Sequence, residues 1–192
     1  MLDWRPFFPL PTPRREQALA LDELCQRVLE GKRLLVAELG TGVGKSAAAV
    51  CLARWLARLE AVPQGFAPGA VVLTSQKILQ DQYIRDFPFA RDLRSSSNFS
   101  CGGLVGKTCG ETARVRKAVG RELAQGLGCP GCPYRSSKDA YAAAELGVTN
   151  YSYFLSETVY AQELPLRHLL IMDEAHNVEE EIRRWEIGRA HV

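Results

Sequence analysis

Short apolar runs alternate along the chain with longer stretches in which apolar residues recur at helical spacing. Between residues 15 and 29 apolar positions recur every three or four residues, which predicts an amphipathic helix. The apolar runs elsewhere are shorter and bounded by turn residues, which favours buried strands. The expected elements, in chain order, are a helix at 15–29, a strand at 33–38, a helix at 45–59, a strand at 70–74, a helix from 76, a weak strand at 147–149, a strand at 169–172 and a helix from 177.

Buried strands that alternate with helices are typical of a parallel α/β sheet covered on both faces. Residues 95–137 break this rhythm, because they are rich in Ser, Gly, Pro, Cys and Arg. The sequence therefore predicts one α/β unit formed by residues 1–94 and 138–185. The segment 95–137 is expected to be an insertion that is held together by something other than a hydrophobic core.

The last seven residues, 186–192, continue no apolar pattern. They resemble the translation of a sequencing-adapter read-through, and we expect them to be a non-native tail. On this interpretation the natural protein continues beyond about Trp185. The alternative is a genuine helix end.

Charge is distributed unevenly along a chain whose formal net charge is only +2. Between Arg85 and Lys138 there are ten basic and four acidic residues, a local excess of six positive charges. A basic segment of this kind can attract phosphate groups. The alternative is a solvated loop that happens to be basic.

The sequence indicates neither export nor membrane insertion. No apolar run approaches the roughly 18 residues that suggest a membrane span, and the N-terminus lacks a basic segment followed by an apolar stretch. A cytoplasmic location is therefore expected. In that compartment the six cysteines are poor candidates for a disulfide framework.

A glycine-rich turn joins the expected strand at 33–38 to the expected helix at 45–59, which is the setting of a phosphate-binding loop. Its backbone N–H groups would face the phosphates beside the positive end of the helix dipole. Lys45 would reach the β- and γ-phosphates of ATP, and the Ser46 hydroxyl would ligate Mg²⁺. A glycine-rich turn without a ligand is the alternative, and Leu39 stands where the strict pattern has glycine. The nucleotide-binding segment reads Gly40-Thr41-Gly42-Val43-Gly44-Lys45-Ser46.

A second motif, Asp173-Glu174-Ala175-His176, follows the apolar run at 169–172. Two carboxylates at the end of a buried strand are what phosphoryl transfer requires opposite a phosphate loop. Asp173 would hold Mg²⁺, and Glu174 would orient and deprotonate the attacking water. His176 is better placed to sense the γ-phosphate. Alone, the motif could be an ordinary turn, but together with the phosphate loop it indicates an ATP hydrolase.

Gln17 precedes the phosphate loop at the place where helicases often have a glutamine that recognises adenine. We expect that role here. A glutamine at the start of a helix can also be merely solvated.

The six cysteines fall into two groups. Cys25 and Cys51 lie among apolar residues at helical spacing and are expected in the core. The other four have the spacing C-x₇-C-x₁₉-C-x₂-C within the insertion, which indicates a metal centre that supplies folding energy. Spacing alone leaves zinc, an iron–sulfur cluster and a redox-active pair open. These four are Cys101, Cys109, Cys129 and Cys132.

Taken in order, these motifs resemble those of the XPD–DinG family of superfamily 2 helicases. The likeness spans about residues 5–180. Besides the phosphate loop and the Asp-Glu-Ala-His box, it rests on Val72-Leu73-Thr74-Ser75-Gln76-Lys77-Ile78-Leu79-Gln80-Asp81-Gln82, Cys132-Pro133-Tyr134 and Val148-Thr149-Asn150-Tyr151.

The resemblance implies a RecA-like P-loop sheet with an inserted [4Fe–4S] domain whose ligands are the four clustered cysteines. It also implies an ATP-dependent DNA helicase that acts on single-stranded DNA and duplex junctions, usually in the 5′→3′ direction. A second RecA-like domain is then expected in the same natural chain. Two rivals are a non-translocating, cluster-bearing ATP switch subunit that binds DNA, and a nuclease-fused relative.

Candidate DNA contacts lie near the strand at 70–74 and within the insertion. The family resemblance implies that Thr74, Ser75 and Gln80 contact the DNA backbone, because their hydroxyl and amide groups can contact phosphates. For the aromatic candidates the alternative is ordinary packing. Groove-lining cations would be Arg114, Arg116, Lys117 and Arg121, and rings available for base stacking are Tyr134, Tyr151, Tyr153 and Phe154.

Overall fold

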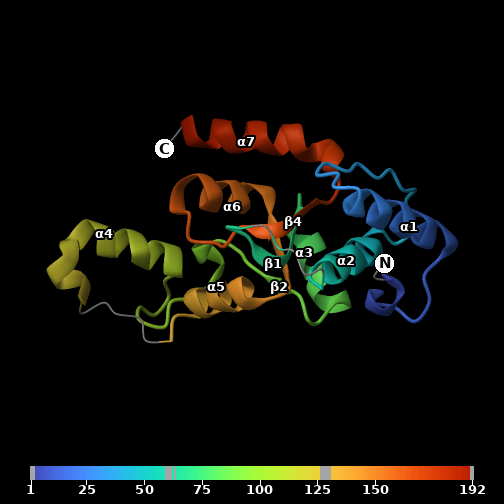
Figure 1. Cartoon of the computed structure of the whole chain (residues 1–192). Helices are drawn as coiled ribbons and strands as arrows, with labels where there is room; N and C mark the ends of the chain where they lie inside the picture. The colour runs from blue at the N-terminus through green and yellow to red at the C-terminus, as the bar shows by residue number, and fades with distance from the viewer. Residues whose placement is uncertain (1–2, 59–61, 63, 126–130, 191–192) are drawn as a thin grey trace.

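The structure, a computed structural model, describes residues 3–58, 62, 64–125 and 131–190. Within them four parallel strands form one sheet in the order β2-β3-β1-β4, and helices cover both faces (Figure 1). This arrangement is compatible with the RecA-like fold that the sequence predicts. The strands are β1 (Ala67–Thr74), β2 (Arg91–Asp92), β3 (Leu146–Asn150) and β4 (Arg167–Met172).

Seven α-helices accompany the sheet in the described part of the chain, with short 3₁₀ or π turns between some of them. The α-helices are α1 (Arg15–Leu29), α2 (Lys45–Leu56), α3 (Lys77–Asp86), α4 (Cys109–Gln125), α5 (Pro133–Ala143), α6 (Tyr151–Ser156) and α7 (Val178–Ala190). The short turns are η1 (Arg5–Phe7), η2 (Ser96–Asn98), η3 (Glu157–Ala161) and η4 (Ala175–Asn177).

The central strand β1 is buried on both faces, which explains its continuous apolar run. Val72 contributes to a core with α1, α2 and α3, and its neighbour Val71 contributes to a second core with α5 and α6. Trp55 of α2 is fully buried in the first core, and Tyr141 of α5 is buried in the second. The alternation of side chains along a strand thus divides one sequence run between two cores.

The strand predicted at 33–38 is wrong, because the structure contains no strand there. Leu34 and Val36 are instead 80% and 89% exposed. Strand β4 forms an edge of the described sheet, and its Leu170 and Met172 are about two-fifths exposed. A strand is buried in a sheet only where its backbone groups are paired, and none of the described strands pairs with residues 33–38.

The other expected elements are confirmed; the helix at 15–29 has the predicted ends, and the others have shifted ends. The helix expected at 45–59 ends at Leu56, and the weak strand at 147–149 runs from Leu146 to Asn150. The two-residue strand β2, which pairs with β3, was not predicted from the sequence. The predicted tail boundary at residue 186 lies inside α7, which continues to Ala190.

The predicted insertion contains little of the sheet. Its described part comprises η2, an isolated antiparallel bridge between Ser100 and Thr108, α4 and the start of α5. In Figure 1, α4 lies at the end of the molecule opposite α1 and α2. Helix α5 extends past residue 137 and packs under β2 and β3, so it connects the predicted insertion to the sheet.

Candidate functional site

Parallel strands place their carboxyl ends at one edge of the sheet, where ligands of such folds bind. Thr74 ends β1, Asn150 ends β3, and Asp173 follows directly after β4. Helix α2 begins beside this edge at Lys45. The edge therefore brings the two predicted nucleotide motifs together.

The glycine-rich loop takes a conformation that only glycine adopts easily. Gly42 and Gly44 have φ values of 75° and 89°, in the left-handed region. A Cβ on Gly44 would also lie 2.4 Å from Nε2 of Gln17, so even a methyl group would clash there. Backbone turns of this kind, followed by a helix N-terminus, present N–H groups to anions. Thr41 and Val43 complete the turn before Lys45.

Two side chains from the start of α1 hold this loop in place. The Gln17 amide donates to the Gly44 carbonyl at 3.0 Å and accepts from the Arg14 N–H at 2.8 Å. The Arg14 guanidinium donates to the Gly42 carbonyl. Gln17 is only 2% exposed, and both ends of its amide are paired within the chain. Its adenine role stays a prediction, and the observed contacts support the loop itself.

The loop and the Asp-Glu-Ala-His box meet through Lys45 and Glu174. The Lys45 ammonium lies 3.6 Å from one Glu174 oxygen, and His176 Nδ1 lies 3.4 Å from the other. Glu174 has φ 52° and ψ 48°, which is rare for a residue that is not glycine. Such a conformation persists where surrounding contacts enforce it, often at functional sites. The three predicted catalytic residues Lys45, Glu174 and His176 are thus brought together.

The fourth, Asp173, is held from several directions. The backbone N–H of Asp173 donates to the Leu73 carbonyl at 3.0 Å, and the backbone carbonyl of Asp173 accepts from the Tyr151 hydroxyl at 3.1 Å. One carboxylate oxygen accepts from the Glu174 N–H and the other from the Tyr83 hydroxyl, each at 3.0 Å. Burial is the main cause that raises the pKa of Tyr151 to about 12, with a further contribution from the Asp173 charge. The carboxylate is therefore fixed in orientation at the strand end.

A groove of about 540 Å³ opens on the same edge, between the carboxyl ends of β1 and β3 and the segment that leads into the insertion. Its charged lining residues are Lys77, Glu157 and Glu181. Most of the remaining lining is hydroxyl groups or amides, which can contact phosphates or sugars without reading sequence. These residues include Ser75, Ser95, Ser96, Asn150, Ser152 and Ser156.

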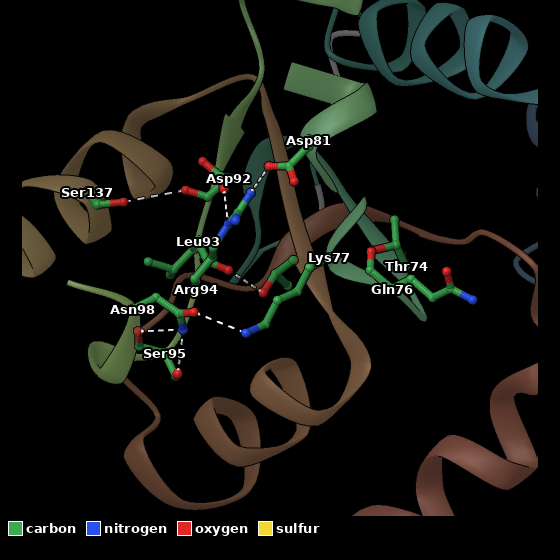
Figure 2. A network of polar contacts seen from close by, with 11 residues as sticks. Thr74, Gln76, Lys77, Asp81, Asp92, Leu93, Arg94, Ser95, Asn98 and Ser137 are labelled. Carbon is green, nitrogen blue, oxygen red and sulfur yellow. Dashed lines mark hydrogen bonds and ion pairs between the residues drawn. The ribbon is translucent and has the colours of Figure 1, made fainter. Parts of the chain in front are cut away.

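Beside the groove, a polar network joins α3 to β2 and the segment that follows it (Figure 2). Arg94 donates to Asp92 at 2.7 Å and also pairs with Asp81 of α3. Lys77, at the start of α3, donates to the Asn98 side chain at 3.1 Å. These contacts hold the first half of α3 against the segment that leads into the insertion.

Of the residues that are predicted to contact the DNA backbone, some lie at the surface and some in the interior. Ser75 lines the groove, whereas Thr74 and Gln80 are fully buried. The Thr74 hydroxyl donates to the Gln76 carbonyl at 3.2 Å. Neither amide atom of Gln80 has a hydrogen-bond partner among the described residues. Only Ser75 of this set therefore faces the groove directly.

Most of the aromatic residues considered for base stacking are packed in the interior, as the alternative interpretation had it. Tyr151 and Tyr153 are buried, and Phe154 packs on the second core. Tyr153 donates to Glu157 at 2.9 Å, and its oxygen lies 2.7 Å from that of Tyr134. Tyr134 is only partly buried and lines the groove, so it is the ring best placed for stacking.

Among the basic candidates of α4, Arg114 and Lys117 are exposed. The side chains of Arg116 and Arg121 lie outside the described part of the structure. Helix α4 therefore presents at least two cations to solvent at the end of the molecule that carries the cysteines.

Three of the four clustered cysteines are described, and Cys129 lies outside the described residues. The sulfurs of Cys109 and Cys132 are 3.8 Å apart. Burial and the neighbouring Cys132 raise the pKa of the Cys109 thiol, with a smaller contribution from Cys101. A bound cation would favour the thiolate form of these neighbouring sulfurs, so the donors suit a metal centre. Among the described residues, however, no three possible ligands are grouped closely enough to define a metal site.

The comparisons with known proteins bear on the carboxyl-terminal third of the chain. Residues 120–187 match the DEAD_2 family model. The matched segment includes the Asp-Glu-Ala-His box but not the phosphate loop, so the two motifs indicate the same chemistry independently. The match supports a helicase-type, ATP-dependent function on nucleic acid. No curated protein matches the chain.

No helix in the described ranges is both long and apolar enough to cross a bilayer.

Sequence reasoning missed several residues that support the site. Arg14 holds the loop, and Tyr83 contacts Asp173. Lys138 pairs with Glu157 at 2.8 Å, which links α5 to the turn after α6. A single basic or aromatic residue in an amphipathic helix carries no spacing pattern, so no sequence signal distinguished these three from ordinary surface or core positions.

Proposed function

We propose that this chain is the first motor domain of an ATP-dependent DNA helicase of the XPD–DinG type. The observation that carries the proposal is the approach of Lys45 to Glu174 at 3.6 Å. It joins a phosphate-binding loop to the carboxylates that such an enzyme requires. The match of residues 120–187 to the DEAD_2 family supports it independently.

In this proposal each residue at the sheet edge has one task in ATP hydrolysis. Lys45 leaves Glu174 for the β- and γ-phosphates, because phosphate carries more charge than one carboxylate. Ser46 and Asp173 would hold Mg²⁺, which would neutralise charge on the phosphates. Glu174, released from Lys45, accepts the proton of the attacking water. His176 stays in contact with Glu174 and reports the γ-phosphate.

The groove beside this site is the proposed path of single-stranded DNA. Ser75 and its neighbouring hydroxyl groups contact the backbone, and Tyr134 offers a ring to a base. Arg114 and Lys117 add positive potential near the insertion. Because Glu157 and Glu181 also line the groove, its affinity depends on hydroxyl contacts as well as on charge.

We further propose that Cys101, Cys109, Cys129 and Cys132 hold a [4Fe–4S] cluster. The family resemblance selects the cluster over zinc, and the close pair Cys109–Cys132 supports a shared metal centre. A cluster there would supply the folding energy that the small insertion lacks. The close pair is also compatible with two thiolates on one tetrahedral zinc, so metal analysis has to separate the two.

A helicase needs a second RecA-like domain, which we place in the natural chain beyond residue 185, and we propose a cytoplasmic location. The rival is a cluster-bearing ATP switch that binds DNA without moving along it. Both hydrolyse or bind ATP, but only the motor separates strands. The test is therefore strand separation by the natural full-length protein on a partial duplex, with Glu174→Gln as the hydrolysis-deficient control. Hydrolysis stimulated by DNA without strand separation would favour the switch.

A further inference from the structure

Tyr83 contacts Asp173, one of the two residues that are predicted to hold Mg²⁺. Its hydroxyl donates a hydrogen bond of 3.0 Å to Oδ2 of Asp173. Tyr83 is 2% exposed, so this contact is not exchanged readily for water. One buried hydroxyl thus connects α3 to the residue that follows β4.

The direction of these contacts determines what the tyrosine can do. Oδ1 of Asp173 accepts from the Glu174 N–H, and Oδ2 accepts from Tyr83, so both oxygens have fixed donors. A carboxylate with two fixed donors has a fixed plane, and its remaining lone pairs point in set directions. Groups that orient a metal ligand in this way are an integral part of metal sites.

Tyr83 also belongs to the helix that borders the groove. Helix α3 begins at Lys77, which lines the groove and donates to Asn98. Tyr83 lies six residues further along this helix (83 minus 77) and packs on Phe87, with ring centroids 5.8 Å apart. The same short helix therefore contacts the groove at one end and Asp173 at the other.

We propose that Tyr83 is a positioning residue of the Mg²⁺ site, which orients Asp173 and ties it to α3. This inference rests on the proposed ATP function. It assigns the tyrosine no proton transfer and no contact with the reacting atoms. A displacement of α3 when the groove is filled would reach Asp173 through this hydroxyl.

The test compares Tyr83→Phe with Tyr141→Phe. Tyr141 is also buried, but its hydroxyl has no hydrogen-bond partner among the described residues, and it lies in the other core. Binding of a fluorescent ATP analogue to the 192-residue chain is measured over a range of MgCl₂ concentrations and in EDTA. For Tyr83→Phe we expect the half-saturating Mg²⁺ concentration to rise about tenfold, the lower end of the range for residues that orient metal ligands. Tyr141→Phe should match the unsubstituted chain.

Two further readings distinguish positioning from a merely structural role. In EDTA, the analogue should bind Tyr83→Phe and the unsubstituted chain with equal affinity, because the phosphate loop is intact. At saturating Mg²⁺ the affinity of the variant should return to within about twofold of the unsubstituted value. An unchanged Mg²⁺ requirement, or an equal loss of affinity in EDTA, would overturn the inference. Failure of the unsubstituted chain to bind the analogue at all would instead overturn the proposed function.

Discussion

The Lys45 ammonium lies 3.6 Å from a carboxylate oxygen of Glu174, although 129 residues separate them in the chain (174 minus 45). Both side chains are about one-third exposed, so the pair is accessible to a competing phosphate. A partly exposed ion pair is worth little on its own. Its importance is geometric, because it places the cation of one motif against the carboxylate of the other.

Replacement of Glu174 with Gln should abolish hydrolysis in the natural full-length protein and leave ATP binding intact. The amide cannot accept the proton of water, and it no longer competes for Lys45. We therefore expect an affinity for ATP equal to or higher than that of the unsubstituted protein. Steady-state hydrolysis and nucleotide binding measure the two effects. Glu179→Gln on the exposed face of α7 is the control, since Glu179 is paired with Arg183 of the same helix, away from the proposed nucleotide site. Hydrolysis at the unsubstituted rate would show that Glu174 has another role.

Replacement of Lys45 with Ala should weaken ATP binding. It removes a charged hydrogen-bond donor, a contact worth about 1.5–3 kcal/mol, so the affinity should fall roughly 10- to 100-fold. Calorimetry or displacement of a fluorescent analogue gives the affinity directly. The exposed Lys32 precedes the loop, and Lys32→Ala should leave the affinity unchanged. Equal binding by Lys45→Ala would contradict the assignment of the phosphate loop.

Gln17→Leu separates support of the loop from recognition of adenine. The substitution leaves the Gly44 carbonyl and the Arg14 N–H without their partner, and a buried unpaired group costs about 1–3 kcal/mol. We expect a lower free energy of unfolding, and an equal loss of affinity for ATP and GTP. Thermal or urea unfolding and binding of the two nucleotides provide these values. A loss confined to ATP would assign adenine recognition to Gln17.

Protein purified without oxygen should be brown and contain about four iron atoms per chain with matching sulfide. Cys129→Ser should release the cluster and leave the sheet folded, because none of the described residues between 95 and 132 belongs to the strands or to their two cores. Cys25→Ala, in the first core, is the control that should keep the metal. Stoichiometric zinc without sulfide, in protein made with sufficient iron, would contradict the cluster.

The 192-residue chain alone should separate no strands. Its described residues form one sheet with one proposed nucleotide site, and such motors close a second domain over ATP. An arginine finger from that domain accelerates phosphoryl transfer by roughly 10³–10⁵ in enzymes that use one. We expect weak ATP binding, very slow hydrolysis and contact with single-stranded DNA that declines as salt rises. Robust unwinding by this chain would mean that self-association replaces the second domain.

The sequence determined the motifs and most of the elements by itself. Glycines that need positive φ, a lysine at a helix start and two carboxylates after an apolar run are local requirements, so their residue types show in the sequence. The helix at 15–29 was predictable because its periodicity reflects which side is buried. The strands around 70–74 and 169–172 were predictable because each is a short, continuous apolar run. The cysteine spacing likewise indicated a shared centre, although it did not choose the metal.

Only the tertiary structure decided which groups meet and which apolar runs find a partner. The run at 33–38 has the composition of a buried strand, yet Leu34 and Val36 are exposed because no described strand pairs with it. Gln17 and Tyr83 have ordinary positions in amphipathic helices, and their roles arise from contacts with Gly44 and Asp173 across long sequence separations. Such contacts depend on the packing of whole elements, so the local spacing of residues does not predict them.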